Sequence, residues 1–223
     1  MSPVVEIERS LIMLGGGGHA KVLLALATSV GHVVAGVCDP RLVSTGVREW
    51  RGLPILGEDE VLTSMNPDSH GLINGLGQMP GQDARQRLYE RWRSEGFSFP
   101  ALVHPFSWVA KDVKLADGAQ VMAGAVIQPD CDIGANSTVN TGANVDHDTR
   151  IGAHVHIAPA AVLCGHVTIG DGTFVGPGAT VGQGIRVGKG AVLAAGVACV
   201  RNVADAEVIM PAQIRRALKQ LKE

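Results

Sequence analysis

The second half of the chain carries an aliphatic residue at every sixth position. From Val103 onward, sixteen of the seventeen positions in this register hold Val, Ile or Leu, and the last holds Cys199, which is also small and apolar. A small or β-branched residue follows four positions later through the middle of the run, and glycine often follows the aliphatic directly. Because a helix repeats every 3.6 residues and a strand every two, a period of six indicates short strands joined by tight bends.

These hexads predict a triangular solenoid. Each hexad forms one short face with its aliphatic side chain inward, so three hexads make an 18-residue coil and seventeen hexads make between five and six coils. An irregular β-sandwich, the alternative, does not account for so regular a register. On spacing alone, the usual preference of parallel crossovers would favour a right-handed coil.

The first hundred residues lack this period and show alternating strand and helix patterns. A buried strand over 11–14 leads into four glycines and His19, and a helix over 20–28 and a second strand over 33–38 follow. A third strand is predicted over 72–76. This is a βαβ unit.

Three segments follow from these patterns. We predict an α/β Rossmann-like βαβ domain over 1–100 and an all-β parallel helix over 101–205. The tail over 206–223 is predicted to hold a short basic helix at 213–222. A charged stretch over 83–95, spaced for i,i+4 pairs, predicts a helix with a solvated outer face.

Composition narrows the class of protein. The 29 glycines and 4% aromatic residues favour a core of small aliphatic side chains with many tight turns. A net charge of −2 without a basic patch argues against nucleic acid as a partner. No segment has the pattern of a membrane span or an export signal. The four cysteines lie far apart, without the spacing of a zinc ribbon or disulfide framework, which favours the reducing cytoplasm.

The glycine loop after the first strand has the spacing of a phosphate-binding turn. Gly15, Gly17 and Ala20 match the fingerprint G-x-G-x-x-G/A, and Asp39 follows about 20 residues later, where an acid can bind ribose. A complete dinucleotide domain needs about six strands and this segment has room for roughly four. A nucleoside diphosphate therefore fits better than NAD, and purely structural use of the glycines as a tight turn is the alternative.

The run from Gly15 to Val22, followed by hexapeptide repeats, resembles the sugar O- and N-acetyltransferases of the bacillosamine, perosamine and sialic acid group over essentially the whole chain. The resemblance implies that the β-helix is left-handed and that acetyl-CoA is the co-substrate, and we expect no metal. It also implies that the N-terminal domain binds a nucleotide-linked sugar through Gly17, Gly18, His19, Asp39, Pro40, Arg41 and Gly77.

Four histidines lie between residues 147 and 166. Acyl transfer to an amine needs a proton acceptor with a pKa near neutrality, a carboxylate that orients it and an N–H for the developing oxyanion. The resemblance makes His147 the general base, Asp148 its partner and Gly165 the oxyanion donor. It also implies that His156, Pro177 and Ala195 contact acetyl-CoA and that Asn140 lies near the amino group of the sugar.

Several alternatives remain open at this point. Consecutive strand residues point to opposite faces, so Asp148 reaches His147 only if the chain bends there, and Asp146 is the rival partner. His154 and His166 read as solvated side chains on bends. A zinc site that includes His154 and His156, as in the γ-type carbonic anhydrases with the same β-helix, is disfavoured because the histidines crowd within 20 residues.

The expected reaction is transfer of an acetyl group from acetyl-CoA to the amine of a nucleotide-linked amino sugar by direct attack. O-acetylation of sialic acid or another glycan, and nucleotide-sugar binding without catalysis, are the alternatives. His147 and His156 are nine residues apart, half a coil, and therefore lie on opposite sides of one prism. Both can approach one acetyl group only in a site shared between chains, which predicts a homotrimer.

Overall fold

The structure, a computed structural model, describes residues 10–211, and the helix predicted at 213–222 lies outside the described residues. Within that range the chain divides into two compact units. The N-terminal unit comprises 10–77 and 83–100, and the C-terminal unit comprises 78–82 and 101–211. No helix among the described residues is long and apolar enough to cross a bilayer.

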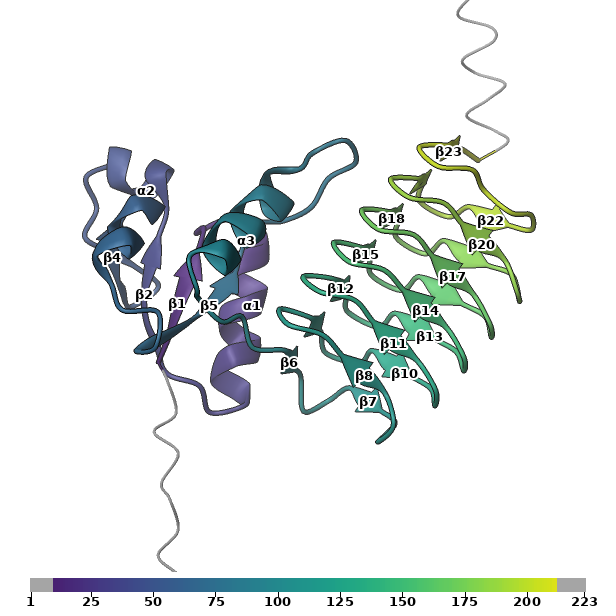
Figure 1. Ribbon diagram of the computed structural model, residues 1–223, viewed down its shortest axis with the longest axis horizontal. Helices are drawn as coiled ribbons and strands as arrows, with labels where there is room; N and C mark the ends of the chain where they lie inside the picture. The colour runs from purple at the N-terminus through teal and green to yellow at the C-terminus, as the bar shows by residue number, and fades with distance from the viewer. Residues whose placement is uncertain (1–9, 212–223) are drawn as a thin grey trace, which may run out of the picture. The chain divides into compact units, whose positions relative to one another are not determined.

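The N-terminal unit is built on a five-stranded mixed sheet (Figure 1) with the order β3-β4-β2-β1-β5. Neighbouring strands are parallel except for the β3–β4 pair, which is antiparallel. The strands are β1 (Ser10–Leu14), β2 (Val34–Cys38), β3 (Glu49–Trp50), β4 (Leu53–Gly57) and β5 (His70–Asn74). The helices are α1 (Gly18–Ser29), α2 (Pro40–Ser44), the 3₁₀ helix η1 (Asp59–Ser64) and α3 (Ala84–Ser94).

The predicted strand, glycine loop, helix and second strand are confirmed as β1, α1 and β2. The estimate of four strands was too low, because the short β3–β4 hairpin was missed. The third predicted strand, at 72–76, is β5, which begins at His70 and ends at Asn74. Gly75, which follows it, contacts Ala20 and Met13 so closely that a Cβ there would lie 2.8 Å from each.

The predicted helix at 83–95 is α3, whose outer face is solvated as expected and whose other face is buried. Asp83 and Arg87 do form an exposed i,i+4 ion pair. Trp92 and Tyr89, however, are buried and pack against Phe97 and Phe99, with ring centroids 5.7 Å and 4.8 Å apart. Three buried positions among charged ones were too sparse to show as an apolar stripe in the sequence.

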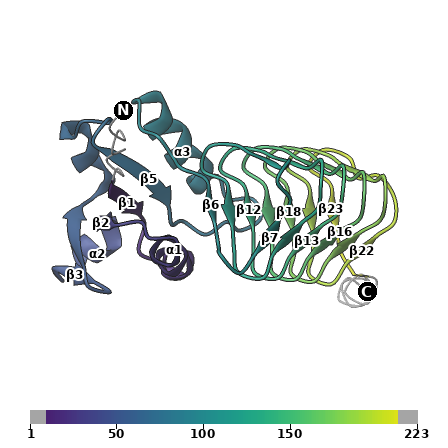
Figure 2. The ribbon, with the colours of Figure 1, turned by 90° about the horizontal axis from the view of Figure 1, so that it is seen from below.

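The C-terminal unit is a left-handed parallel β-helix whose coils stack as successive rungs (Figures 1 and 2). Each coil contributes one two-residue strand to each of three sheets, which we call faces 1, 2 and 3 in chain order. Strands pair in parallel with the strand 18 residues away, as Asn144 does with Val162. The corners between faces are called edges 1–2, 2–3 and 3–1, and in one coil they comprise residues 140–143, 146–149 and 152–155.

Face 1 comprises β6 (Leu102–Val103), β9 (Gln120–Val121), β12 (Thr138–Val139), β15 (His156–Ile157), β18 (Phe174–Val175), β21 (Val192–Leu193) and β23 (Val208–Ile209). Face 2 comprises β7 (Trp108–Val109), β10 (Val126–Ile127), β13 (Asn144–Val145), β16 (Val162–Leu163), β19 (Thr180–Val181) and β22 (Ala198–Cys199). Face 3 comprises β8 (Lys114–Leu115), β11 (Asp132–Ile133), β14 (Arg150–Ile151), β17 (Thr168–Ile169) and β20 (Arg186–Val187).

The sequence pattern explains how the coils hold together. The aliphatic residue of each hexad points inward, and these side chains form one continuous core along the axis. From Ala119 onward the position four residues later is also buried, and where it is Ser or Thr its hydroxyl donates to a carbonyl of the next coil. Ser137 bonds Gly152 O at 2.7 Å and Thr173 bonds Gly188 O at 2.7 Å.

The β-helix continues beyond the predicted end at residue 205. β23 pairs with β21, so residues 208 and 209 belong to face 1 rather than to a separate tail. The last coil is two residues short, because Val203 bridges to Val187 in the place where the six-residue register expects residue 205. Because of this two-residue shift, the final aliphatic positions fall outside the six-residue register of the sequence.

Candidate active site

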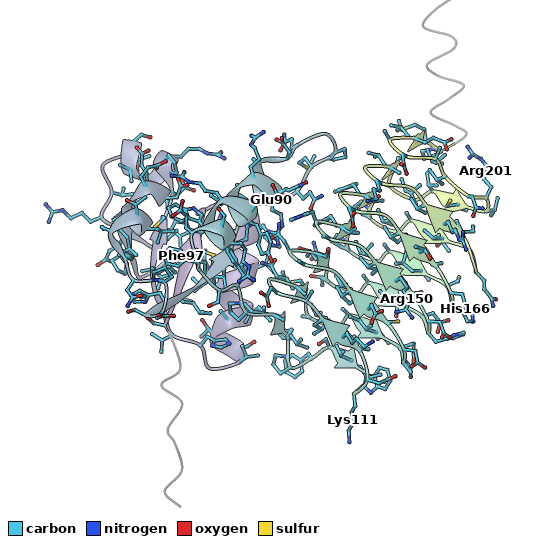
Figure 3. The ribbon with its side chains drawn as sticks, viewed as in Figure 1. Glu90, Phe97, Lys111, Arg150, His166 and Arg201 are labelled. Carbon is cyan, nitrogen blue, oxygen red and sulfur yellow. The ribbon has the colours of Figure 1, made fainter. Side chains whose placement is uncertain are left out.

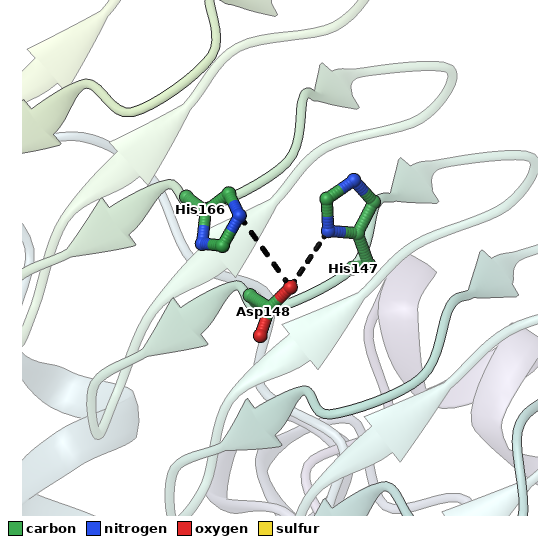
Figure 4. A group of neighbouring side chains, drawn as sticks. All are labelled: His147, Asp148 and His166. Atoms are coloured by element: carbon green, nitrogen blue, oxygen red, sulfur yellow. Dashed lines mark hydrogen bonds and ion pairs between the residues drawn. The ribbon is translucent and has the colours of Figure 1, made fainter.

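His147 lies on edge 2–3, two residues after the end of β13. Asp148 follows it with a φ of 59°, in the left-handed region, which turns the chain so that both side chains lie on the same side of the edge. The two are joined by a 2.7 Å hydrogen bond between His147 Nδ1 and Asp148 Oδ2 (Figure 4). Of the two carboxylates that flank His147, Asp148 is therefore the one that contacts the ring. Asp146 instead accepts a hydrogen bond from the backbone N–H of His147 at 2.8 Å.

This hydrogen bond determines which ring nitrogen can act as a base. The Asp148 carboxylate only accepts hydrogen bonds, so Nδ1 carries the proton and Nε2 presents its lone pair. The same hydrogen bond raises the pKa of His147 above its ordinary value, and the nearby Asp146 and Asp130 carboxylates add to the effect. Solvent reaches both partners, with side-chain exposures of 48% and 41%, so the pair lies at the surface, where a substrate can approach it.

Gly165 lies against the open side of this ring, one coil further along. A Cβ at residue 165 would lie 2.8 Å from both Nε2 and Cε1 of His147, so only glycine leaves room for the ring in its observed position. In the described part of the chain, no protein atom accepts a hydrogen bond from the Gly165 N–H. The residue that packs against the ring of the base therefore carries an N–H without a protein acceptor, which a ligand can use.

His166 completes a group that we call the edge 2–3 cluster: His147, Asp148, Gly165 and His166. Its Nε2 lies 3.6 Å from Asp148 Oδ2, the oxygen that bonds His147, and the two rings meet edge to face at 5.1 Å (Figure 4). Figure 3 shows its side chain projecting from the same edge as Lys111. The sequence interpretation of His166 as a solvated bend residue missed this contact. The 18-residue period would have revealed it, because 166 is one coil from 148.

The edge 2–3 cluster also has the composition of a weak metal site. Ligand atoms of His147, Asp148 and His166 all lie within 4.8 Å of one another. The contact between His147 Nδ1 and Asp148 Oδ2 is at ordinary hydrogen-bond distance, which fits a proton shared between the two side chains. We assign no metal to the group.

The residues predicted to contact acetyl-CoA lie elsewhere on the prism. His156 is on face 1, where its ring is buried and stacks on Phe174 with centroids 5.2 Å apart and planes 6° apart. Pro177 and Ala195 occupy equivalent places on edge 1–2 in successive coils, and the Gly196 N–H donates to Pro177 O at 2.9 Å. Asn140 is on the same edge, where its Oδ1 accepts from the N–H of Thr141 at 2.8 Å.

A single chain therefore presents two separate groups of predicted site residues in its C-terminal unit. His147, Asp148 and Gly165 are together on edge 2–3, whereas His156 belongs to face 1, the face opposite that edge. The core of the β-helix fills the space between them. Within one chain, the core therefore separates His147 from His156.

The four glycines of the N-terminal loop divide into two pairs. Gly15 has a φ of 86°, and a Cβ there would lie 2.6 Å from Leu76 Cδ1, while a Cβ at Gly16 would lie 2.5 Å from Leu42 Cδ1. These two are required by the fold. Around Gly17 and Gly18, which cap and begin α1, no atom lies within 4 Å of an added Cβ. This open space at a helix N-terminus suits an anionic group.

The predicted sugar-nucleotide residues gather at the carboxyl ends of β1, β2 and β5. β1 lies between β2 and β5, so the strand order reverses here, which is where open α/β sheets bind ligands. His19 and Gly77 are neighbours, since a Cβ on Gly77 would lie 3.7 Å from His19 Cβ. Pro40 and Arg41 begin α2 and are exposed.

Asp39 has a structural function that the sequence did not reveal. It caps α2 by accepting from the N–H groups of Arg41 at 2.7 Å and Leu42 at 3.2 Å. Its other oxygen accepts from Gly16 N–H at 2.6 Å, which ties the glycine loop to α2. The carboxylate is buried and already holds three backbone donors, so its main function in this structure is to shape the loop.

A pocket of about 250 Å³ opens at this end of the sheet. The glycine loop and α2 provide one side, and residues that the sequence did not single out, Asp59 and Leu88, provide another. Nearby, the buried guanidinium of Arg85 donates to the carbonyls of Asn74 at 2.8 Å and Leu76 at 2.7 Å. Burial lowers the pKa of Arg85 to about 9. These bonds fix the loop that leads to Gly77.

Comparisons with known proteins agree with both units. Residues 10–92 match the PglD N-terminal domain family, and 148–183 and 166–199 match the bacterial transferase hexapeptide family. No curated protein matched the chain.

Several solved structures are similar over almost the whole length. A variant of perosamine N-acetyltransferase from Caulobacter crescentus, with one histidine replaced by asparagine, was solved with CoA and GDP-perosamine. It is 34% identical, covers 91% of this chain and 93% of its own, and superposes with a TM-score of 0.82. The acetyltransferase domain of PglB from Neisseria gonorrhoeae, solved with acetyl coenzyme A, is 32% identical over 90% of this chain and 95% of its own, with a TM-score of 0.83.

WeeI from Acinetobacter baumannii shares the fold at 20% identity, with a TM-score of 0.80 over 91% of this chain and 97% of its own. The identity to the first two proteins, together with both family matches, establishes the relationship. The chain belongs to the family of hexapeptide-repeat sugar acetyltransferases that carry a PglD-type N-terminal domain.

Proposed function

We propose that the chain transfers the acetyl group of acetyl-CoA to the amino group of a nucleotide-linked amino-deoxy sugar, of the UDP-4-amino sugar or GDP-perosamine type. The observation that carries the proposal is the edge 2–3 cluster, in which the exposed His147 is paired with Asp148 through Nδ1 and its ring lies against Gly165. The CoA and GDP-perosamine bound to the Caulobacter relative support both substrates. The open loop at Gly17 and Gly18 supports a diphosphate in the N-terminal unit.

His147 acts as general base in a direct attack. As the amine nitrogen bonds to the thioester carbon, His147 Nε2 accepts the proton that the nitrogen loses, and Asp148 stabilises the imidazolium. The Gly165 N–H donates to the oxygen that becomes negative. When the C–S bond breaks, the proton on Nε2 goes to the departing sulfur, which returns His147 to its starting state.

We further propose that the working enzyme is a homotrimer in the cytoplasm. The separation of the edge 2–3 cluster from His156, Pro177 and Ala195 supports the trimer, because one chain's edge 2–3 can then face the acetyl-CoA residues of the next. A cytoplasmic location agrees with the need for acetyl-CoA and sugar nucleotides.

A panel of sugar nucleotides tests the reaction. UDP-, GDP- and dTDP-linked amino sugars are each incubated with acetyl-CoA and the protein, CoA thiol is measured, and mass spectrometry identifies the acetylated product. We expect turnover with at least one amino sugar and none with the matched sugar that carries hydroxyl in place of the amine. Thiol release at only the rate of acetyl-CoA hydrolysis, or acetylation of sialic acid hydroxyls alone, would contradict the proposal.

Thermal shifts with the same ligands test the nucleotide site separately. A nucleotide-sugar at about 100 times its Kd stabilises the protein by about 2.7 kcal/mol, which a melting curve resolves. NAD should give no shift, and a shift with NAD alone would reassign the glycine loop.

A further inference from the structure

His166 is the member of the edge 2–3 cluster that the proposed reaction leaves without a function. It occupies the left-handed position of its coil, with a φ of 57°, where Asp148 and Asp130 stand in the two preceding coils and Gly184 in the next. Left-handed backbone disfavours side chains with a Cβ, so such residues concentrate where a particular side chain is needed. The shared position stacks His166 directly beside Asp148.

The contacts of His166 converge on one oxygen atom. Asp148 Oδ2 is 2.7 Å from His147 Nδ1 and 3.6 Å from His166 Nε2, so one carboxylate oxygen faces two imidazoles. The rings stand at 89° to each other with centroids 5.1 Å apart, which limits the rotation of His147 toward the next coil. Gly165, immediately before His166, leaves the space that this arrangement needs.

We propose that His166 is a positioning residue for His147 and acts through the Asp148 carboxylate that both rings approach. An N–H of His166 directed at Oδ2 keeps the carboxylate turned toward the cluster. It also takes up part of the negative charge that would otherwise act on His147 alone. The effect on catalysis rests on the proposed function, whereas the sharing of the carboxylate does not.

The direction of the effect follows from the charges around His147. Asp148, Asp146 and Asp130 all favour the protonated ring, and Asp112 stands beside Asp130, whose N–H it accepts at 2.8 Å. His166 Nε2 lies 3.6 Å from the same Asp148 oxygen that bonds His147. Asparagine at position 166 tolerates the left-handed backbone. In His166→Asn the Asp148 carboxylate interacts with only one imidazole, that of His147, so His147 binds its proton more tightly.

Titration of the histidine rings by NMR tests this without any substrate. The Cε1–H resonance of His147 is followed against pH in the full-length protein and in His166→Asn, and is assigned by its loss in His147→Ala. We expect the midpoint for His147 to rise by roughly half a pH unit, because the Asp148 carboxylate then interacts with the His147 ring alone. The rise should shrink at high ionic strength, because both side chains are exposed.

His154→Asn is the matched control. His154 is also a histidine with left-handed backbone, but it lies on edge 3–1, with its ring 3.0 Å from Asn136 Nδ2. The titration of His147 should be the same in this variant as in the wild type. An unchanged midpoint in His166→Asn, or an equal change in both variants, would overturn the inference.

Kinetics then separate the inference from the proposed function. In His166→Asn, kcat should fall several-fold, less than the roughly 10²-fold loss expected when the base itself is removed, with KM for acetyl-CoA unchanged. The acidic limb of kcat/KM should move to higher pH with the NMR midpoint. If the midpoint moves but the wild type acetylates no amino sugar, the proposed function fails and the shared carboxylate stands. If the wild type is active and neither midpoint nor limb moves, the inference alone fails.

Discussion

Asp148 has a φ of 59°, and this one backbone angle brings two consecutive side chains onto the same side of edge 2–3. In extended strands such neighbours point to opposite faces. A base and its orienting carboxylate can therefore be adjacent in sequence only at a bend, and the β-helix supplies one every six residues. The cost of left-handed backbone at a residue with a Cβ is on the order of 1 kcal/mol.

The dependence of activity on pH follows from this contact. The general base works in its neutral form, so activity falls as pH drops through the pKa of His147, which Asp148 raises. Asp148→Asn removes the charge and keeps a side chain suited to the bend, so the acidic limb of kcat/KM should move to lower pH, with a lower plateau. Asp146→Asn is the control, because Asp146 acts on the ring only through space. If the acidic limb moves further in Asp146→Asn than in Asp148→Asn, then Asp146 rather than Asp148 is the partner of His147.

The sequence predicted three of the four residues of the edge 2–3 cluster and missed the fourth, His166. His147, Asp148 and Gly165 were singled out through the resemblance, but the choice between Asp146 and Asp148 depended on a backbone angle that residue types do not determine. His166 was missed because it was considered as a lone histidine rather than as the residue one coil from Asp148. Asp39 was predicted near the nucleotide, yet its three backbone donors show that it also holds the glycine loop.

At the scale of elements, the four glycines at 15–18, which lead into α1, fall into two pairs: one pair is required by packing and the other faces open space. Gly15 and Gly16 are needed because side chains there would collide with Leu76 and Leu42. Gly17 and Gly18 face open space, so the fold itself does not need them to be glycine. A need for glycine at positions 17 and 18 therefore comes from the ligand.

Gly18→Ala tests that division. Alanine is a better helix former than glycine, so the melting temperature should hold or rise. The KM for the nucleotide-sugar should increase while that for acetyl-CoA stays constant, since the added methyl group occupies the open space. Gly15→Ala is the contrasting variant and should lower the stability by about 1 kcal/mol or more, because of the clash and its positive φ. Unchanged KM values in a stable Gly18→Ala would place the diphosphate elsewhere.

The elements were predictable where a pattern repeats and not where it breaks. The hexad period identified every strand from β6 to β22, because each inward position must be apolar in a core one side chain thick. The two-residue deletion before Val203 concealed β23. In the N-terminal unit, β3 and β4 were missed because a two-residue strand and a partly exposed one carry little alternation.

At the scale of the whole molecule, one chain separates the proposed base from the predicted acetyl-CoA residues. His147 and His156 stand on an edge and on its opposite face, with the core between them. A closed trimer solves this if each chain's edge 2–3 faces the next chain's face 1 and edge 1–2. The hypothesis of a trimer and the hypothesis of a shared site therefore stand or fall together.

Mixing subunits tests the shared site. His147→Ala and His156→Ala, each inactive alone, are refolded together in equal amounts. About three-quarters of random trimers are mixed, and each has one of three interfaces with both native histidines, so about a quarter of wild-type activity should return. Mixed trimers without recovery would mean that both histidines act from one chain. Activity in His156→Ala alone would remove His156 from the site.

The most direct test of the account is the turnover of His147→Ala with the amino sugar nucleotide that the wild type accepts. The substitution removes a proton acceptor from an exposed bend, so acetyl-CoA binding and oligomeric state, measured by calorimetry and sedimentation, should match the wild type. Under those conditions kcat should fall by roughly 10²–10⁴-fold. A kcat within about threefold of the wild type, well short of the loss expected for a general base, would show that His147 does not accept the proton.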